Sequence, residues 1–282
     1  MRYRSLNWFV PLVAATLAVC APCRSAAEPA DKPEEASQSI DAAEALARKD
    51  YDTALRIYRS LAKHGDADAQ YNIGVMYANG LGIGQDNAEA VDWYRKAAKK
   101  GLAKAQYNLG VSYYYGTGVD KDLAAAVRWF RKAAEQGYPD AQHNLALMYH
   151  NGEGVEQNLA EALSWYGKAA DQGVADAQYN LGTMYRDGQG VKQDFNAALG
   201  WFHKAAVQGD ASALYNLGAM YNNGQGVERD VVEAYKWFSL ALAKAKDPQV
   251  KGEAAAGLRL VSTDMTPEQL SEAQGLSGQS KH

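Results

Sequence analysis

Cysteine is nearly absent from this chain of 282 residues, because its only two cysteines, Cys20 and Cys23, both lie close to the N-terminus. Once that region is removed as a leader, no cysteine remains for disulfide bonds or thiol chemistry. Proline is also scarce, with 7 residues against 26 glycines. This balance fits helices joined by glycine-rich turns rather than a disordered chain.

An excess of one charge is lacking as well. Lys and Arg number 29 against 33 Asp and Glu, which gives a formal net charge of −4, and no block of like charge stands out. Proteins that bind nucleic acid usually carry a basic patch or a high isoelectric point, whereas the isoelectric point here is about 5.8. The composition therefore argues against nucleic acid as a partner.

Long hydrophobic runs are missing beyond the first 27 residues. There a basic start, MRYR, precedes the apolar run SLNWFVPLVAATLAVCA and the small residues Ser25 and Ala27. This order is typical of a secretory signal peptide, so we expect residues 1–27 to be a leader cleaved after Ala27. No later stretch approaches the ~20 apolar residues of a membrane helix. We expect no integral membrane segment in the mature chain.

Two alternatives to a cleaved leader stay open. An uncleaved membrane anchor is disfavoured by Pro11 and by the shortness of the apolar run. A lipid anchor at Cys20 or Cys23 is the second alternative, although Val19 stands where a bacterial lipoprotein signal needs a small residue. We therefore expect an exported protein, periplasmic or secreted, with association to the outer membrane left open.

A repeat of 36 residues dominates the rest of the chain. Five tryptophans follow one another at that step, and so do five glycines, five asparagines, five tyrosines and a Gly-x-Gly pair. The positions are Trp93, Trp129, Trp165, Trp201 and Trp237; Gly65, Gly101, Gly137, Gly173 and Gly209; Asn72, Asn108, Asn144, Asn180 and Asn216; and Tyr77, Tyr113, Tyr149, Tyr185 and Tyr221.

The recurring Gly-x-Gly is a turn rather than a phosphate-binding loop. A phosphate loop is needed once, at the N-terminus of one helix, whereas this pair occurs five times, first at Gly80 and Gly82. Glycine supplies the positive φ that ends one helix and turns the chain into the next. Each repeat therefore consists of two helices, the first typified by DAQYNIGVMYAN and the second by NAEAVDWYRKAAKKG.

A glycine in the middle of the first helix costs about 1 kcal/mol relative to alanine, yet it recurs as Gly74, Gly110, Gly182 and Gly218, with Ala146 as the exception. Because this free-energy cost recurs in four repeats, we infer that the glycine brings a packing advantage in each of them. We expect the two helices of a repeat to approach too closely at this point for a larger side chain.

The unit resembles the Sel-one-like repeat, a relative of the tetratricopeptide repeat, through A-x-A-Q-Y-N-L-G-x-x-Y-x-x-G-x-G-V and A-x-x-W-[YF]-x-K-A-A-x-x-G. The resemblance covers about two-thirds of the chain. It implies an all-α, right-handed superhelical solenoid, here of about thirteen helices. Ala146 and the sequence WFSLALAKAK of the last repeat depart from the pattern.

The predicted organisation has six parts. They are a signal peptide (1–27), a disordered linker (28–40), a tetratricopeptide-like helix pair (41–65), five repeats (66–246), a C-terminal helical cap (247–275) and a flexible tail (276–282). The two terminal helical parts shield the apolar ends of the array, as solenoids require. Within the cap, Thr266, Pro267 and Gln269 form the start signal of a helix.

Catalytic residues, metal ligands and a cofactor are not expected. Ser60 and Lys63 match Ser-x-x-Lys, and some cysteine-rich relatives bind or hydrolyse β-lactams, so a β-lactam-binding enzyme is an alternative. However, the repeat alignment places Ser60 near the end of an ordinary second helix. His143 and His150 have no cysteine nearby and no i, i+4 histidine partner. The favoured interpretation is a non-catalytic scaffold, with an envelope structural lipoprotein as a third possibility.

The resemblance implies where a partner would bind. In tetratricopeptide relatives the face of the first helices opposite the core lines a concave groove that binds extended peptides. The candidate groove residues here are Lys104, Tyr107, Asn108, Val111, Tyr115, Asp140, His143, Asn144, Leu147, Asp176, Tyr179, Asn180 and Thr183. The Asn column has a structural alternative, which is to satisfy carbonyl groups within its own repeat, and the Tyr column has another, which is to wedge between repeats. The partner is expected to be a protein or a peptide.

Overall fold

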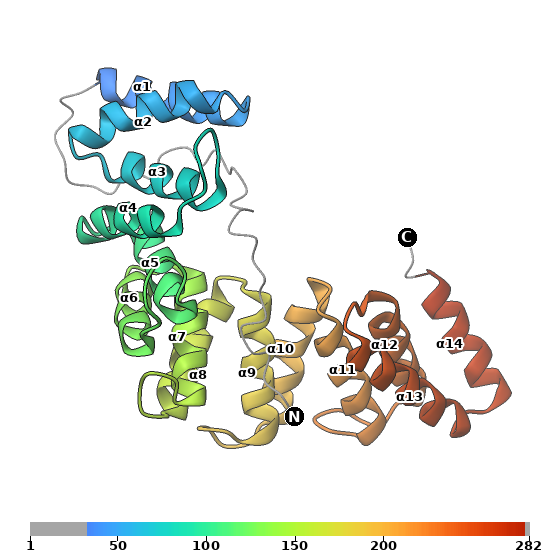
Figure 1. Cartoon of the computed structure of the whole chain (residues 1–282). Coiled ribbons are helices and arrows are strands. Elements are labelled where there is room, and N and C mark those ends of the chain that lie inside the picture. The colour runs from blue at the N-terminus through green and yellow to red at the C-terminus, as the bar shows by residue number, and fades with distance from the viewer. Residues whose placement is uncertain (1–32, 280–282) are drawn as a thin grey trace. The chain divides into compact units, whose positions relative to one another are not determined.

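The computed structural model describes residues 33–279 of the chain. Within these residues it contains fourteen helices and no strand, one helix more than the sequence analysis expects. The helices are α1 (Pro33–Ala47), α2 (Tyr51–Lys63), α3 (Ala67–Asn79), α4 (Asn87–Lys99), α5 (Ala103–Tyr115), α6 (Leu123–Glu135), α7 (Pro139–Asn151), α8 (Leu159–Asp171), α9 (Ala175–Asp187), α10 (Phe195–Val207), α11 (Ala211–Asn223), α12 (Val231–Lys244), α13 (Pro248–Thr263) and α14 (Pro267–Gln279). The fold is an all-α repeat solenoid (Figure 1).

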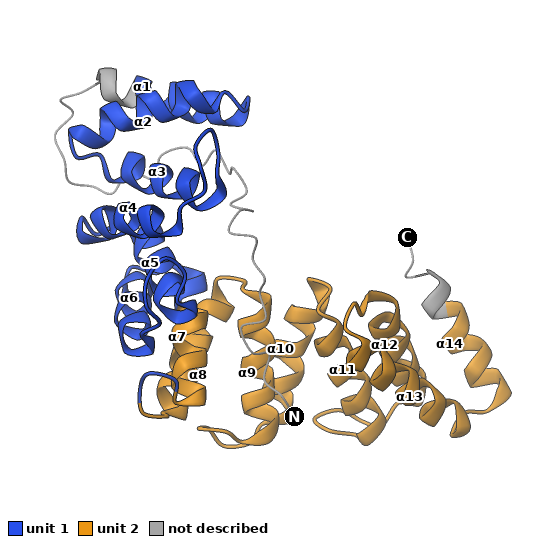
Figure 2. Cartoon of the chain, in the orientation of Figure 1, with its two compact units in different colours: residues 1–141, 153–155 blue, residues 142–152, 156–282 orange. Residues whose placement is uncertain are grey.

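The helices form two compact units, shown in Figure 2. Unit 1 comprises residues 1–141 and 153–155, and unit 2 comprises residues 142–152 and 156–282. Inside each unit, helices that follow one another in the chain pack together, as α3 packs on α4 and α9 on α10. The boundary falls within α7, after Ala141.

The turn inside each repeat confirms the interpretation of Gly-x-Gly. Both glycines of the first pair, Gly80 and Gly82, have a φ of +65°, a left-handed conformation that glycine adopts without steric cost. The loop is closed by a hydrogen bond from the Asp86 backbone N–H to the Tyr77 carbonyl, 3.0 Å long. The Asp86 carboxylate then caps α4 by accepting from the backbone N–H groups of Ala88 and Glu89.

The mid-helix glycines lie against the buried ring of the second helix, as expected. A Cβ placed at Gly110 would lie 2.7 Å from a carbon of the Phe130 ring, and one at Gly74 would lie 2.7 Å from the Tyr94 ring. Real Cβ atoms do not approach a ring this closely, so the packing of these repeats requires a residue without a side chain there. The same contact joins Gly182 to Phe202.

The second glycine of each pair joins consecutive repeats. A Cβ at Gly118 would lie 2.1 Å from the Asn87 carbonyl oxygen at the start of α4, in the repeat before. Gly82 lies in the same way against Tyr51, at the start of α2. Each loop therefore rests on the N-terminal turn of the preceding second helix, which fixes the spacing of neighbouring repeats.

The linker prediction for residues 28–40 is wrong from residue 33 onward, because α1 begins at Pro33. Proline is accepted in the first turn of a helix, where its missing N–H would have had no partner. Ala42 and Ala45 are buried in the cluster that α1 shares with α2, and this packing supports the helix. The expected leader, Cys20, Cys23 and residues 28–32 lie outside the described residues.

The C-terminal cap consists of α13 and α14. A Cβ at Gly257 of α13 would lie 2.8 Å from the Phe238 ring, so α13 covers the last repeat as another first helix would. The Thr266 Oγ1 accepts from the Gln269 backbone N–H, and the Gln269 side chain accepts from the Thr266 N–H. The helix start signal is thus confirmed. The flexible-tail prediction is wrong for residues 276–279, which continue α14.

Candidate functional site

The face of the first helices in unit 1 is centred on α3 and α5. The Lys104 ammonium lies 2.6 Å from the Asp68 carboxylate and 4.7 Å from the centre of the Tyr71 ring. The Asn108 side chain donates to the Tyr71 hydroxyl over 3.4 Å. These contacts of Lys104 and Asn108 join one repeat to the next. This part of the face therefore consists of residues that already hold neighbouring repeats together.

Aromatic side chains occupy the rest of this face in unit 1. The Tyr107 ring lies 5.7 Å from Phe130 and 5.1 Å from Tyr138, measured between ring centres. Tyr115, at the end of α5, is 43% exposed and meets Tyr114 edge to face. Tyr115 is therefore the candidate aromatic residue that a partner can reach directly.

The remaining unit 1 candidates differ in accessibility. Val111 is half-buried on α5, and Asp140 is exposed in the first turn of α7. Burial and the nearby Asp140 charge raise the pKa of Tyr138 to about 12. Burial likewise raises the pKa of Tyr71. These hydroxyl groups stay neutral near pH 7 and act as hydrogen-bond donors and acceptors only.

In unit 2 the corresponding face is more closed. The Asn180 side chain lies 3.3 Å from His143 Nε2, and the Tyr179 ring lies 5.9 Å from Phe202. The Thr183 hydroxyl donates to the Tyr179 carbonyl. Asp176 is half-buried in the first turn of α9. This face therefore uses its polar groups internally.

Four predicted groove residues are buried, which corrects the prediction that they line an accessible surface. They are Asn144, Leu147, Asn180 and Thr183, and Leu147 and Asn180 are each only 1% exposed. The reason is visible at Asn180 and Asn108, which pair with the neighbouring first helix through His143 and Tyr71. The Asn108 and Asn180 side chains thus contact the neighbouring repeat, whereas the Asn216 side chain donates to the Ser212 carbonyl within its own repeat.

A column one position before the end of each first helix is absent from the predicted groove residues. Its members are Ala78, Tyr114, His150, Arg186 and Asn222. No two repeats carry the same residue there, and this variability was the available signal. At this position the Tyr114 hydroxyl donates to the Glu153 carboxylate over 2.7 Å, so the column carries specific polar chemistry.

Arg186 is the one arginine among the five residues of this column. Its guanidinium forms two hydrogen bonds to the Asp187 carboxylate, 2.7 and 2.9 Å long, and a third to the Asn216 side chain. Its centre lies 5.9 Å from the Phe202 ring, and its side chain is only 13% exposed. A fork held by two hydrogen bonds is rigid, so Arg186 is a fixed feature of the unit 2 face.

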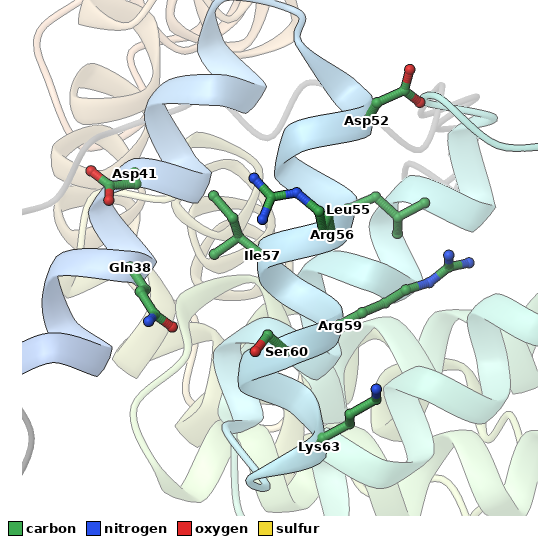
Figure 3. A pocket seen from close by; sticks show the side chains of 9 residues that line it. All are labelled: Gln38, Asp41, Asp52, Leu55, Arg56, Ile57, Arg59, Ser60 and Lys63. Atoms are coloured by element: carbon green, nitrogen blue, oxygen red, sulfur yellow. The ribbon is translucent and has the colours of Figure 1, made fainter.

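The described residues contain no group of three or more His, Cys, Asp or Glu side chains placed to hold a metal ion. Among residues 33–279 no helix is both long enough and apolar enough to cross a membrane. Ser60 and Lys63 are exposed on α2, where both line an open pocket of about 730 Å³. Figure 3 shows their side chains pointing in different directions.

The fold and the variable polar columns define a helical repeat protein of the kind that binds other proteins. The Sel1 repeat family model matches residues 45–66, 67–102, 103–138, 139–174, 175–210 and 211–245. The chain belongs to the Sel1 repeat family, whose members are generally non-enzymatic scaffolds for protein interaction. All but the last residue of the first segment lies within the helix pair predicted at 41–65 as tetratricopeptide-like.

One solved structure supports this assignment, and two others are also similar in sequence. A Sel1 repeat protein from Oxalobacter formigenes is 35% identical, with a TM-score of 0.72, over 76% of this chain and 88% of that one. A protective antigen of uropathogenic Escherichia coli with the same fold is 29% identical, with a TM-score of 0.36, over 87% and 68%. A Sel1 repeat protein from Klebsiella pneumoniae is 23% identical, with a TM-score of 0.44, over 73% and 97%. No curated protein shows significant sequence similarity to the chain.

Proposed function

We propose that the chain is a non-catalytic adaptor that binds a protein or peptide through the first-helix faces of its repeats. The observation that carries this proposal is the contrast between two kinds of column. The glycine and asparagine columns, which are nearly uniform, are used in packing. The column of Lys104 holds Asp68, Lys104, Asp140, Asp176 and Ser212, and the column of Arg186 holds a different residue in each repeat. A uniform scaffold with varied side chains is suited to specific recognition.

Location belongs to the same proposal. The N-terminal sequence supports export to the periplasm or the medium, with a lipid anchor at Cys20 or Cys23 as the alternative. N-terminal sequencing of material from the envelope or the medium tests it, with residue 28 as the expected start. Recovery of Met1 would contradict cleavage, and acyl labelling that depends on either cysteine would support the anchor.

Tyr115 offers the most direct test of the binding face. A photo-crosslinking amino acid placed at Tyr115, which is exposed on α5, is expected to capture the partner in intact cells. The same group at Trp165, half-buried on the second helix α8, is the control and is expected to give no adduct. Adducts from Trp165 alone would place the partner on the second helices instead.

A charge exchange then tests recognition without disturbing the fold. The pair Asp68→Lys with Lys104→Asp preserves the ion pair between α3 and α5 but reverses its direction. The thermal stability is expected to stay near that of the parent, because exposed ion pairs contribute only ~0–1 kcal/mol. The captured partner is expected to bind less tightly. Unchanged binding would exclude this pair from the partner interface.

The β-lactam alternative rests on Ser60 and Lys63 lining the pocket of Figure 3. Ser60 lies in the second half of α2, where backbone N–H groups are bonded within the helix and none is left to stabilise an oxyanion. A nitrocefin assay decides the matter, and no turnover is expected. Turnover that disappears in Ser60→Ala would replace the adaptor proposal with an enzyme.

A further inference from the structure

A buried glutamine recurs near the start of the first helices and joins neighbouring repeats. Gln106 donates to the Ala98 carbonyl at the end of α4, in the preceding repeat, over 3.2 Å. Its own side-chain oxygen accepts from Gln136, at the end of α6, over 2.7 Å. Gln178 has the same arrangement with Ala170 and Gln208. In these repeats both ends of the buried amide are satisfied.

The first repeat breaks this pattern. Lys100 stands where the next three repeats have Gln136, Gln172 and Gln208, and its ammonium lies beside Gly65. Gln70 is 7% exposed and donates only a 3.5 Å bond to the Ala62 carbonyl. Its buried side-chain oxygen has no hydrogen-bond partner. An unsatisfied buried acceptor costs about 1–3 kcal/mol, so this site lacks a donor that the other repeats supply internally.

Gln70 contributes to an open pocket of about 380 Å³ in unit 1, which we call the repeat-1 pocket. The pocket is lined by Arg59, Ala62, Lys63, Gln70, Trp93 and Lys96. Three of its residues are cations, and none of the three forms an ion pair with a described carboxylate. The Lys96 ammonium lies 3.7 Å from the centre of the Trp93 ring. The lysine lines the pocket, and no described carboxylate neutralises its charge.

The positive charge continues beyond the pocket along α2. Arg59 and Lys63 also line the larger pocket shown in Figure 3, together with Arg56 and with the acids Asp41 and Asp52. Arg56, Arg59 and Lys63 are spaced by three and four residues, so they follow one stripe of the helix. An extended ligand can therefore meet cations both inside and beside the repeat-1 pocket. This cluster of cations is not apparent from the sequence, because Arg59 and Lys63 lie on α2 and Lys96 lies on α4.

We propose that the repeat-1 pocket binds an acidic peptide segment. A carboxylate of the peptide is held by Arg59, Lys63 and Lys96, and a peptide N–H donates to the unsatisfied Gln70 oxygen. Trp93 provides an apolar wall for the adjoining part of the peptide. The site uses α2, the start of α3 and α4, so it is separate from the first-helix face and does not depend on that face binding anything.

Acidic and neutral probe peptides test the proposal. A fluorescein-labelled peptide of alternating Glu and Gly is titrated with the full chain and followed by fluorescence anisotropy, and its Gln-for-Glu analogue is the neutral probe. The acidic peptide is expected to bind at least about tenfold more tightly than the analogue, since the charge pairing is lost in the latter. Equal affinities, or no binding of the acidic peptide up to about 1 mM, would overturn the proposal.

Matched variants separate the pocket from general attraction. Arg59→Glu with Lys63→Glu is expected to weaken acidic-peptide binding by about tenfold or more. Lys99→Glu with Lys132→Glu makes the same change in net charge at exposed sites outside the pocket and is expected to change affinity by less than about threefold. Equal losses in both would overturn the pocket in favour of non-specific electrostatics. Melting curves show whether each variant is folded. If Arg59→Glu with Lys63→Glu does not fold, the neutral pair Arg59→Gln with Lys63→Gln takes its place.

Gln70→Leu tests the hydrogen bond. This variant is expected to weaken binding of the acidic peptide about threefold to tenfold. Competition by inorganic phosphate is expected to stay unchanged, because phosphate contacts only the cations. An unchanged affinity for the acidic peptide would exclude Gln70 from the site.

Vesicles of phosphatidylglycerol are the last probe. Binding to vesicles but not to the peptide, lost in Arg59→Glu with Lys63→Glu, would overturn the peptide in favour of a membrane surface.

Discussion

At the scale of single residues, the contact between a glycine and an aromatic ring fixes the geometry of a repeat. Gly110→Leu is expected to lower the free energy of unfolding by about 1–3 kcal/mol or more, because the new side chain must displace the Phe130 ring. Gly167→Leu is the control, since a Cβ there meets nothing within 4 Å, and it is expected to be neutral or stabilising. Denaturant titrations of the two variants compare them. Equal destabilisation would mean that the ring does not set the helix distance.

The buried glutamines give a second prediction at this scale, this time about stability. Gln106→Leu is expected to lower the free energy of unfolding by about 1–3 kcal/mol, because the Ala98 carbonyl and the Gln136 amide both lose a partner. Gln70→Leu removes an oxygen that has no partner and is expected to leave stability unchanged or to raise it. Thermal melts of the two variants measure the difference. The reverse order of stability would contradict the hydrogen-bond pattern described for unit 1.

His150 makes unit 2 sensitive to acid. Burial lowers the pKa of His150 below its ordinary value, so the folded chain binds this proton less readily than the unfolded chain. The resulting stability is fully present above the unfolded pKa of about 6.5 and is lost as the pH falls through the folded value. His150→Leu is therefore expected to show a smaller loss of unfolding free energy from about pH 8 to about pH 5.5. A slope in His150→Leu equal to that of the parent would exclude His150 as the cause.

At the scale of helices, the second helices share one N-terminal device. The Asp194 carboxylate accepts from the Ala197 backbone N–H at the start of α10 over 2.9 Å. Asp194→Ala is expected to cost about 0.5–2 kcal/mol in unfolding free energy. Asp171→Ala, at the exposed last residue of α8, removes an acid from the negative end of a helix and is expected to be neutral or slightly stabilising. Chemical denaturation distinguishes them, and a larger loss for Asp171→Ala would rule out the capping explanation.

The helices also show how far periodicity carries a prediction. The 36-residue step located the paired helices, the turn glycines and the close approach of the two helices at the mid-helix glycine, because each depends on residues of one repeat. It placed Asn144, Leu147, Asn180 and Thr183 on an open face, yet the structure buries them. A helical wheel shows which side of one helix a residue occupies. It does not show how closely the next repeat covers that side.

At the scale of the molecule, a solenoid gains stability from neighbouring repeats rather than from one central core. α13 packs on α11 and α12, and α14 packs on α12. A chain that ends at residue 246 is expected to lose amide protection in α11 and α12 but to retain it in α3 and α4. Hydrogen exchange with mass spectrometry measures this directly. An equal loss of protection in α3 and α11 would show that the whole chain unfolds as a single cooperative unit.

The sequence by itself determined the repeat, its helix pairs, its turns and its family resemblance, because these follow from residues close together in the chain. Only the tertiary structure decided which polar groups remain available to a partner. Arg186 proved to be held by Asp187 and Asn216, whereas Gln70 was left without a hydrogen-bond partner for its oxygen beside Arg59 and Lys96. The physical reason is that a hydrogen bond or an ion pair is satisfied by whatever packs against it, and in a repeat protein such a neighbour often belongs to the next repeat, as Asn216 does for Arg186.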